Sequence, residues 1–255
     1  MNLSTEQLTR YSRNILLEDF GREGQEKLLK SNVLVIGAGG LGSSVLYYLS
    51  AAGVGNIGIV DSDKVDLSNL QRQIIHKFED IGRLKTESSA EKIKKLNSDI
   101  KIKTYAQRFT LENGLDIVKD YDFVIDATDN FLSKFLINDI CVKANKVFSH
   151  AGCVGYAGQT MTVIPGQTAC YRCVFQDMPN EACAPSSLRD GILGAVPGIL
   201  GSIQATEAIK YFLGFNELLT DQLLTFNIRT MAFRKISLKR QELCKCRDAQ
   251  IGRLY

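Results

Sequence analysis

The chain of 255 residues lacks the patterns that mark a secreted or membrane-spanning protein. No apolar run reaches about 18 residues, the length that spans a bilayer. The most apolar stretch, residues 192–203, is interrupted by three glycines and a proline. The first residues do not place a positive segment before an apolar one, as a signal peptide does. We therefore expect a cytoplasmic protein that has no membrane partner.

The sequence also lacks a strong excess of either charge. Its net charge is only +3, and the Lys and Arg residues are not gathered into one block, so we expect no nucleic-acid partner. Hydrophobic residues make up 45% and charged residues 23%, as in ordinary globular proteins. Seven cysteines in a cytoplasmic chain favour a metal site or reactive thiols over a framework of disulfides.

The most informative segment that is present is a glycine-rich turn. Residues 33–36 form a short apolar run, and Gly37, Gly39 and Gly42 follow it with the spacing G-x-G-x-x-G. A strand that leads through such a turn into a helix lets backbone N–H groups and the helix dipole bind phosphate. About 20 residues later a second apolar run ends in Asp61, whose carboxylate suits ribose hydroxyls. These features predict a nucleotide site.

Apolar runs alternate with helix-like segments along much of the chain, which predicts a doubly wound, mostly parallel, Rossmann-like α/β sheet. Strands are expected over residues 33–36, 57–60, 100–106, 123–127, 147–154 and 159–164, and two more within residues 223–238. Helices are expected over residues 4–30, 43–52, 84–97 and 203–213. In the helix at 84–97, Lys92, Lys94 and Lys95 are interpreted as a solvated face.

We interpret residues 1–255 as a single domain. It begins with a helical arm (1–30), continues through a nucleotide-binding core (31–165) and ends in a C-terminal part (166–255). The segment 176–191 is rich in Pro, Asn, Asp, Ser and Gly, which predicts a mobile surface loop.

The polar string Ser68-Asn69-Leu70-Gln71-Arg72 follows Asp61 closely, Lys85 opens the next helix, and Asp129 follows a later strand. The carboxyl ends of parallel strands converge on one crevice, where two cations and a Mg²⁺-binding carboxylate suit a polyphosphate. Simpler interpretations are a helix cap for Asp129, a surface lysine for Lys85 and a loop ion pair for Arg72. The two histidines, His76 and His150, provide no evident acid–base pair for a nicotinamide, and we assign them no role.

Seven segments in fixed order resemble the ThiF/MoeB/HesA family of ubiquitin-activating-like adenylyltransferases over nearly the whole chain. They are residues 10–13 (Arg-Tyr-Ser-Arg), 37–42, 61–73, 82–85, 126–130, 170–173 and 204–210. The resemblance implies a homodimer that uses MgATP to adenylylate the C-terminal Gly-Gly carboxylate of a ubiquitin-like sulfur carrier protein (ThiS- or MoaD-like). Pyrophosphate is released, and the product serves thiamine or molybdopterin synthesis.

The same resemblance implies a role for each matching residue. Asp61 would hold the ribose, Asp129 would bind Mg²⁺, and Arg13, in sequence terms an ordinary solvated helix residue, would reach ATP in the partner subunit. The catalytic residues implied are Arg13, Arg72, Lys85, Asp129 and Cys183. The nucleotide-binding residues implied are Gly37, Gly39, Gly40, Gly42, Asp61, Ser68, Asn69, Leu70, Gln71, Arg72, Lys85, Asp129 and Asn130.

Four cysteines form a predicted zinc site. Cys170 and Cys173 have the C-x-x-C spacing that lets two thiolates share a tetrahedral zinc ion, although a redox pair has the same spacing. The family has a second C-x-x-C near the C-terminus, where this chain has Cys244 and Cys246 with one residue between them. A regular strand would direct those two side chains to opposite faces, so the fourth ligand is in question. Zinc bound here would link two cysteine pairs that are distant in the sequence, and would thus act as a clasp that stabilises the tertiary structure.

A lone loop cysteine is usually incidental, yet in sulfur-transfer members of the family a cysteine near the position of Cys183 links to the carrier or carries sulfur. The chain ends soon after the second cysteine pair, so we expect sulfur to come from a separate donor protein. Two other functions compete with this interpretation. One is an NAD-dependent oxidoreductase, which rests on the glycine turn and Asp61 alone. The other is a non-catalytic, zinc-bearing scaffold subunit.

Overall fold

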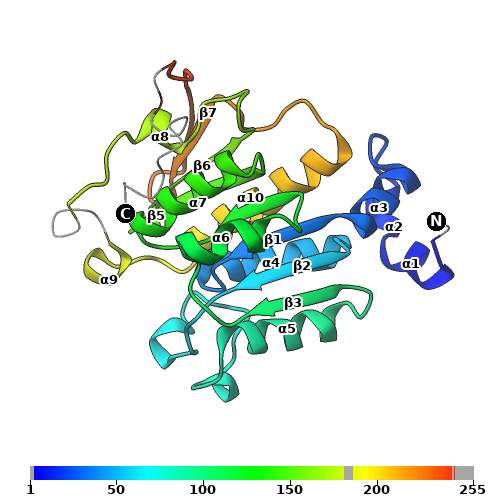
Figure 1. Cartoon of the computed structure of the whole chain (residues 1–255). Coiled ribbons are helices and arrows are strands. Elements are labelled where there is room, and N and C mark those ends of the chain that lie inside the picture. Colours follow the sequence, from blue (N-terminus) through cyan, green and yellow to red (C-terminus); the bar gives the residue numbers. More distant parts are fainter. Residues whose placement is uncertain (1–2, 181–185, 243, 245–255) are drawn as a thin grey trace.

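The computed structural model describes residues 3–180, 186–242 and 244 of the chain. Within these residues the strands form one eight-stranded sheet in the order β3-β2-β1-β4-β5-β6-β7-β8 (Figure 1). Neighbouring strands from β3 to β5 pair in parallel, and those from β5 to β8 pair antiparallel. The strands are β1 (Asn32–Ile36), β2 (Asn56–Val60), β3 (Lys101–Tyr105), β4 (Phe123–Asp126), β5 (Val147–Val154), β6 (Ala157–Val163), β7 (Gln222–Asn227) and β8 (Ala232–Ser237).

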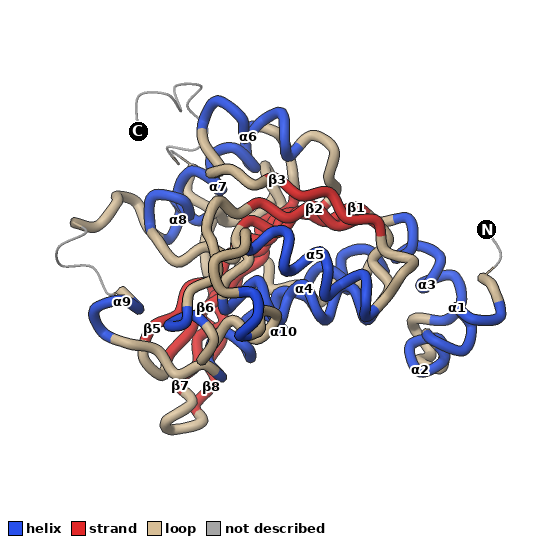
Figure 2. Tube along the Cα trace, turned by 90° about the horizontal axis from the view of Figure 1, so that it is seen from below, coloured by secondary structure: helices blue, strands red, loops and turns tan. Residues whose placement is uncertain are grey.

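Helices cover both faces of the sheet (Figure 2). One face packs around Val33 and Val35 of β1, and the other packs around Leu34 and Ile36. Because β1 is buried on both faces, its sequence is a continuous apolar run rather than an alternating one. The first face carries α3 (Gly21–Lys30), α4 (Gly40–Ala52), α5 (Lys85–Leu96) and α10 (Ala195–Leu213); the second carries α6 (Leu111–Val118), α7 (Phe131–Lys143) and α8 (Tyr171–Val174). The predicted doubly wound, mostly parallel α/β fold is confirmed.

The described part of the chain contains no helix with both the length and the apolar character needed to cross a bilayer. A short helix, α9 (Ser187–Asp190), lies inside the segment 176–191, which was predicted to be a mobile surface loop.

The N-terminal segment, predicted to be helical over residues 4–30, is divided into α1 (Thr5–Arg10), α2 (Ser12–Ile15) and α3. Tyr11 separates the first two helices; its ring is buried, and its hydroxyl accepts a hydrogen bond from Asn97 Nδ2 at 2.8 Å. Gly21 has a φ of +58°, a left-handed conformation that a continuous right-handed helix does not contain. Burial of Tyr11 and the turn at Gly21 therefore break the amphipathic segment.

The prediction that Lys92 is solvated is wrong. Its Nζ lies 2.6 Å from both carboxylate oxygens of Asp80, whose side chain is 0% exposed. Burial by itself would raise the pKa of Asp80, but hydrogen bonds from Lys92 and its neighbours outweigh burial and lower that pKa to about 2. Lys92 follows Lys85 by seven residues, so both lie on the buried face of α5, whereas Lys94 and Lys95 are exposed as predicted.

We predict that Lys92→Met lowers the free energy of unfolding at pH 7 by about 3 kcal/mol, because it leaves a buried carboxylate without its closest cation. The matched control is Lys95→Met on the same helix, where the side chain is 73% exposed and the expected change is below about 0.5 kcal/mol. Urea denaturation measures both. A depressed pKa stabilises the fold above the unfolded value of about 3.9 and stops doing so as pH falls toward 2. The difference in the free energy of unfolding between wild type and Lys92→Met should therefore become smaller in acid. Equal losses of stability at pH 7 for Lys92→Met and Lys95→Met would contradict the prediction.

Candidate nucleotide site and cysteine cluster

The turn between β1 and α4 depends on glycine at two positions. Gly37 has a φ of +103°, and a Cβ there would lie 2.6 Å from the carbonyl oxygen of Ala127. A Cβ on Gly42 would overlap the carbonyl oxygen of Gly37, so α4 approaches the end of β1 too closely for a side chain. Gly39 and Gly40 lie between them and are half-buried. All four predicted glycines thus form one tight turn at the carboxyl end of β1.

Asp61 follows β2 and is joined to this turn through the backbone. Its Oδ2 accepts a hydrogen bond from the Ala38 N–H at 2.8 Å, and its Oδ1 accepts one from the Asp63 N–H at 2.8 Å. Burial raises the pKa of Asp61 above its ordinary value, although the Lys85 charge and the two N–H donors oppose that shift. The carboxylate therefore lies beside the glycine turn, where two neighbouring parallel strands end.

Lys85 is the first residue of α5, and its amine contacts the segment that follows β2. Its Nζ lies 2.9 Å from Asp63 Oδ2, and its side chain is only 8% exposed. The simpler interpretation of Lys85 as a surface lysine is therefore wrong. Arg72 is half-buried; its Nη1 donates to the carbonyl oxygen of Ser68 at 3.0 Å, and its side chain lies against Gly40. No carboxylate in the described ranges pairs with Arg72, so an ion pair within the loop does not account for it.

The loop that joins Asp61 to Arg72 is held by its own side chains. Asp66 Oδ1 accepts hydrogen bonds from the Ser68 N–H at 2.8 Å and from the Ser68 hydroxyl at 2.6 Å. Asn69 Oδ1 accepts one from the Asp66 N–H at 3.2 Å. These bonds cap a short 3-10 turn, η1 (Leu67–Asn69), just before Arg72. The predicted site residues on this loop are Ser68, Asn69, Leu70 and Gln71.

Asp129 and Asn130 follow β4, the other neighbour of β1. Asn130 is the N-cap of α7, and its Oδ1 accepts a hydrogen bond from the Ser133 N–H at 2.9 Å. Asp129 is exposed, and its carboxylate has no hydrogen bond or ion pair with the residues that the structure describes. The simpler interpretation of Asp129 as the helix cap is wrong, because Asn130 has that role. Asp129 therefore presents a free carboxylate next to the glycine turn.

Sequence reasoning missed Lys134, which supports the turn that carries Asp129. It is buried in α7, and its Nζ donates to the carbonyl oxygens of Thr128 and Ala151 at 2.7 and 2.6 Å. It also lies 3.3 Å from Asp126 Oδ2. Burial would raise the pKa of Asp126, but the Lys134 charge and a hydrogen bond from His150 outweigh it and lower that pKa to about 2. The sequence did contain a signal for this role: Lys134 lies within a mostly apolar helix that closely follows a strand ending in Asp126.

Arg13 lies near the amino ends of the strands, whereas the residues described above lie near their carboxyl ends. It belongs to α2, which follows Tyr11, and Tyr11 contacts Asn97 and Gly53 at the C-terminal ends of α5 and α4. These helix ends lie beside the amino ends of the strands, and Figure 1 shows α1 and α2 on the side from which the strand arrows start. Within one chain, Arg13 is therefore not brought to the glycine turn.

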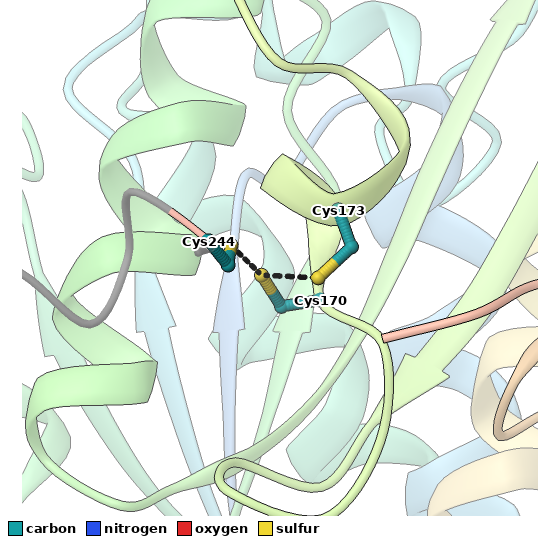
Figure 3. Close-up of side chains that lie close together, drawn as sticks. All are labelled: Cys170, Cys173 and Cys244. Carbon is teal, nitrogen blue, oxygen red and sulfur yellow. Dashed lines mark hydrogen bonds between the residues drawn. The ribbon is translucent and has the colours of Figure 1, made fainter. Parts of the chain in front are cut away.

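Three buried cysteines converge between α8 and the C-terminal segment (Figure 3). Cys170 Sγ lies 3.8 Å from Cys173 Sγ and 3.5 Å from Cys244 Sγ, and all three sulfurs lie within 4.8 Å of one another. Two thiolates on one tetrahedral zinc ion lie about 3.8 Å apart, so this donor set fits zinc. Cys246 and Cys183 lie outside the described residues.

A buried ion pair attaches the C-x-x-C segment to α7. Arg172, which lies between the two cysteines, contacts Asp139 with Nε and Nη2 at 2.7 and 2.8 Å, and both side chains are at most 5% exposed. The neighbouring Asn138 accepts a hydrogen bond from the Tyr171 N–H at 2.9 Å. One helix thus begins at Asn130 near the glycine turn and holds the cysteine cluster close to its other end.

The chain is similar to known proteins in both sequence and fold. Residues 11–247 match the model of the ThiF family. The chain is 42% identical over 238 residues to "Adenylyltransferase and sulfurtransferase MOCS3-1" of Zea mays, covering 93% of this chain and 51% of the maize protein. It is 38% identical over 249 residues to "Sulfur carrier protein adenylyltransferase" of Thermus thermophilus, covering 96% and 92%. A crystal structure of E. coli MccB with AMPCPP and MccA has a TM-score of 0.82 at 25% identity, covering 93% of this chain and 74% of MccB. The chain spans about half the length of the two maize proteins it matches.

We predict that Asn130→Ala lowers the free energy of unfolding by about 1 kcal/mol, because it removes the side-chain acceptor that caps α7. Asp129→Ala, one residue earlier, removes no hydrogen bond within the described structure and should change stability by less than about 0.5 kcal/mol. Chemical denaturation compares the two variants. A larger loss for Asp129→Ala would show that Asp129, and not Asn130, stabilises the start of the helix.

Proposed function

Because this chain belongs to the ThiF family, we propose that it uses MgATP to adenylylate the C-terminal Gly-Gly carboxylate of a small ubiquitin-like sulfur carrier protein. One observation carries the proposal: the glycine turn, Asp61, Lys85 and the unpartnered Asp129 all lie where β1, β2 and β4 end. The name of the Thermus relative supports the substrate class. The carrier would be ThiS- or MoaD-like, and the product would serve thiamine or molybdopterin synthesis.

The proposed reaction needs stabilisation of charge more than it needs a general base. A C-terminal carboxylate is ionised at pH 7, so its oxygen can bond to the α-phosphorus while the bond to pyrophosphate breaks, giving acyl-AMP. Asp61 would accept hydrogen bonds from the ribose hydroxyls. The N–H groups of the glycine turn, together with Arg72 and Lys85, would hold the phosphate oxygens. The remaining nucleotide contacts would come from the loop between Ser68 and Arg72.

The carboxylate of Asp129 suits Mg²⁺, because it is exposed and has no protein partner among the described residues. When bound there, Mg²⁺ would neutralise part of the phosphate charge. Asn130, as the cap of α7, keeps the Asp129 turn fixed to the start of the helix.

We also propose that the protein acts as a homodimer. Arg13 lies near the amino ends of the strands, away from the glycine turn of its own chain, so it could act only on a nucleotide in another subunit. In such a dimer the guanidinium of Arg13 would add positive charge at the phosphates, which is worth several kcal/mol to phosphoryl chemistry in other enzymes.

The cysteine cluster is proposed to bind structural zinc through Cys170, Cys173, Cys244 and Cys246. Zinc bound to these residues would tie the C-terminal segment to α8 and contribute to folding stability. Sulfur would come from a separate donor protein. Cys183 is proposed to link to the carrier or to relay sulfur after adenylylation.

Asp129→Ala should reduce adenylate formation by roughly 100-fold or more, because it removes the proposed Mg²⁺ ligand. The assay is carrier-dependent incorporation of labelled pyrophosphate into ATP, with a ThiS- or MoaD-like protein that ends in Gly-Gly. Asp116→Ala, which removes a side chain that is 80% exposed on α6, is the matched control and should react like wild type. Near-normal exchange by Asp129→Ala would refute the Mg²⁺ assignment. Absence of pyrophosphate exchange in wild type would refute the proposed adenylyltransferase activity and would favour an oxidoreductase or a non-catalytic scaffold.

Metal analysis of the purified protein should find about one zinc ion per chain, and the double variant Cys170→Ser/Cys173→Ser should lose it, because two of the proposed thiolate ligands are gone. Cys153→Ser is the control, since Cys153 is a half-buried thiol outside the cluster. Its zinc content should match that of wild type. A wild-type protein purified without zinc, or a double variant that retains it, would refute the clasp.

A further inference from the structure

His76 connects the glycine turn to α5. The side chain is 4% exposed, its Nε2 lies 2.9 Å from the carbonyl oxygen of Ala38, and its Nδ1 lies 2.9 Å from Ser88 Oγ. Ala38 is the middle residue of Gly37-Ala38-Gly39, and its N–H is the group that donates to Asp61. Both polar groups of Ala38 therefore have side-chain partners: the half-buried Asp61 just after β2, and the buried His76 on the loop before α5.

The chemistry of the partners determines the protonation state of the His76 ring. A carbonyl oxygen can only accept, so Nε2 must carry a proton and donate it to Ala38. Burial lowers the pKa of His76 below its ordinary value, so the ring is neutral at pH 7. In a neutral ring with Nε2–H, Nδ1 is an acceptor and faces the Ser88 hydroxyl, whose single proton also lies within reach of the Asp80 carboxylate. The ring is thus fixed at both nitrogens.

The contact with Ala38 also determines the direction of the next N–H group. In a planar trans peptide the C=O of Ala38 and the N–H of Gly39 point in opposite directions. Holding the carbonyl toward His76 therefore turns the Gly39 N–H to the other side of the turn. No described residue accepts a hydrogen bond from that N–H, and Gly39 immediately precedes the first residue of α4.

We propose that His76 is a positioning residue, which holds the Gly39 N–H in the orientation that binds a phosphate oxygen of a nucleoside triphosphate. The inference rests on the proposed nucleotide site and adds a specific donor to it. Ser88 lies one turn after Lys85 on α5, so the same imidazole also fixes the turn relative to the helix that carries the Lys85 amine. An N–H oriented before binding contributes more affinity than one that must rotate on binding.

The test compares MgATP binding by wild type, His76→Phe and His76→Gln, measured by isothermal titration calorimetry. Phenylalanine fills the space without a donor, whereas glutamine places an N–H near the position of Nε2. We expect His76→Phe to weaken MgATP binding about tenfold or more. A factor of this size is usual for one hydrogen bond to a charged group, here the bond from the Gly39 N–H to a phosphate oxygen. His76→Gln should restore most of the affinity for MgATP. Adenosine, which has no phosphate, should not distinguish His76→Phe from wild type.

Ile75→Val is the matched control for a loss of packing. Ile75 is the preceding residue, is 0% exposed and belongs to the core, so this variant should lower the melting temperature but leave MgATP affinity within about twofold. Equal MgATP affinity for His76→Phe and wild type would overturn the inference, as would failure of His76→Gln to bind better than His76→Phe. Wild type that binds no MgATP would overturn the proposed function itself, and the inference with it.

A measurement on wild type keeps the inference testable if His76→Phe does not fold. The ¹⁵N chemical shifts of the His76 ring distinguish its two neutral tautomers. We expect a protonated Nε2 and an unprotonated Nδ1 at pH 7. The opposite tautomer would place Nε2 and the Ala38 carbonyl as two facing acceptors, which would overturn the proposed contact.

Discussion

The close approach of α4 to the end of β1 is the constraint on which the site depends. The carbonyl oxygen of Gly37 occupies the space that a side chain on Gly42 would need, so the helix begins directly above the strand. That approach brings Ala38 within reach of Asp61 on the neighbouring strand. Another helix of this face, α10, packs against α4, with Gly201 facing Ser44 across the contact. A larger residue at Gly42 would therefore displace α4 from the strand and disturb each of these contacts.

Much of the fold was predictable because the central strands are buried on both faces. Val33 and Leu34 face opposite helical layers, yet both are apolar, so β1 appears as an uninterrupted run. Strands of this kind alternate with helices, and short right-handed connections leave few possible topologies. Since carboxyl ends of parallel strands share one edge, the convergence of Asp61 and Asp129 on the glycine turn also followed from sequence. The meeting of Cys170 with Cys244, 74 residues apart, came from family resemblance.

What the sequence did not reveal depends on partners that are distant along the chain. Lys92 is an ordinary charged helix residue until Asp80 is placed against it. Asp129 and Asn130 are equally good helix caps by residue type, and only the backbone of α7 selects Asn130. His76 follows the polar loop with no motif of its own, and its partner Ala38 is 38 residues away. Local patterns thus located the elements and the crevice, whereas the contacts that orient the side chains required three-dimensional packing.

The helix α7 has its N-cap, Asn130, beside the glycine turn, and its Asp139 pairs with Arg172, which lies between Cys170 and Cys173. Asn130 and Asp139 are separated by about 14 Å along the helix axis, at about 1.5 Å per residue. A regular helix changes its length little, so these two contacts keep a nearly fixed separation. Its backbone amides should accordingly exchange hydrogen in a single cooperative opening rather than turn by turn. The cysteine cluster is thereby joined, through one helix, to the turn that carries Asp129.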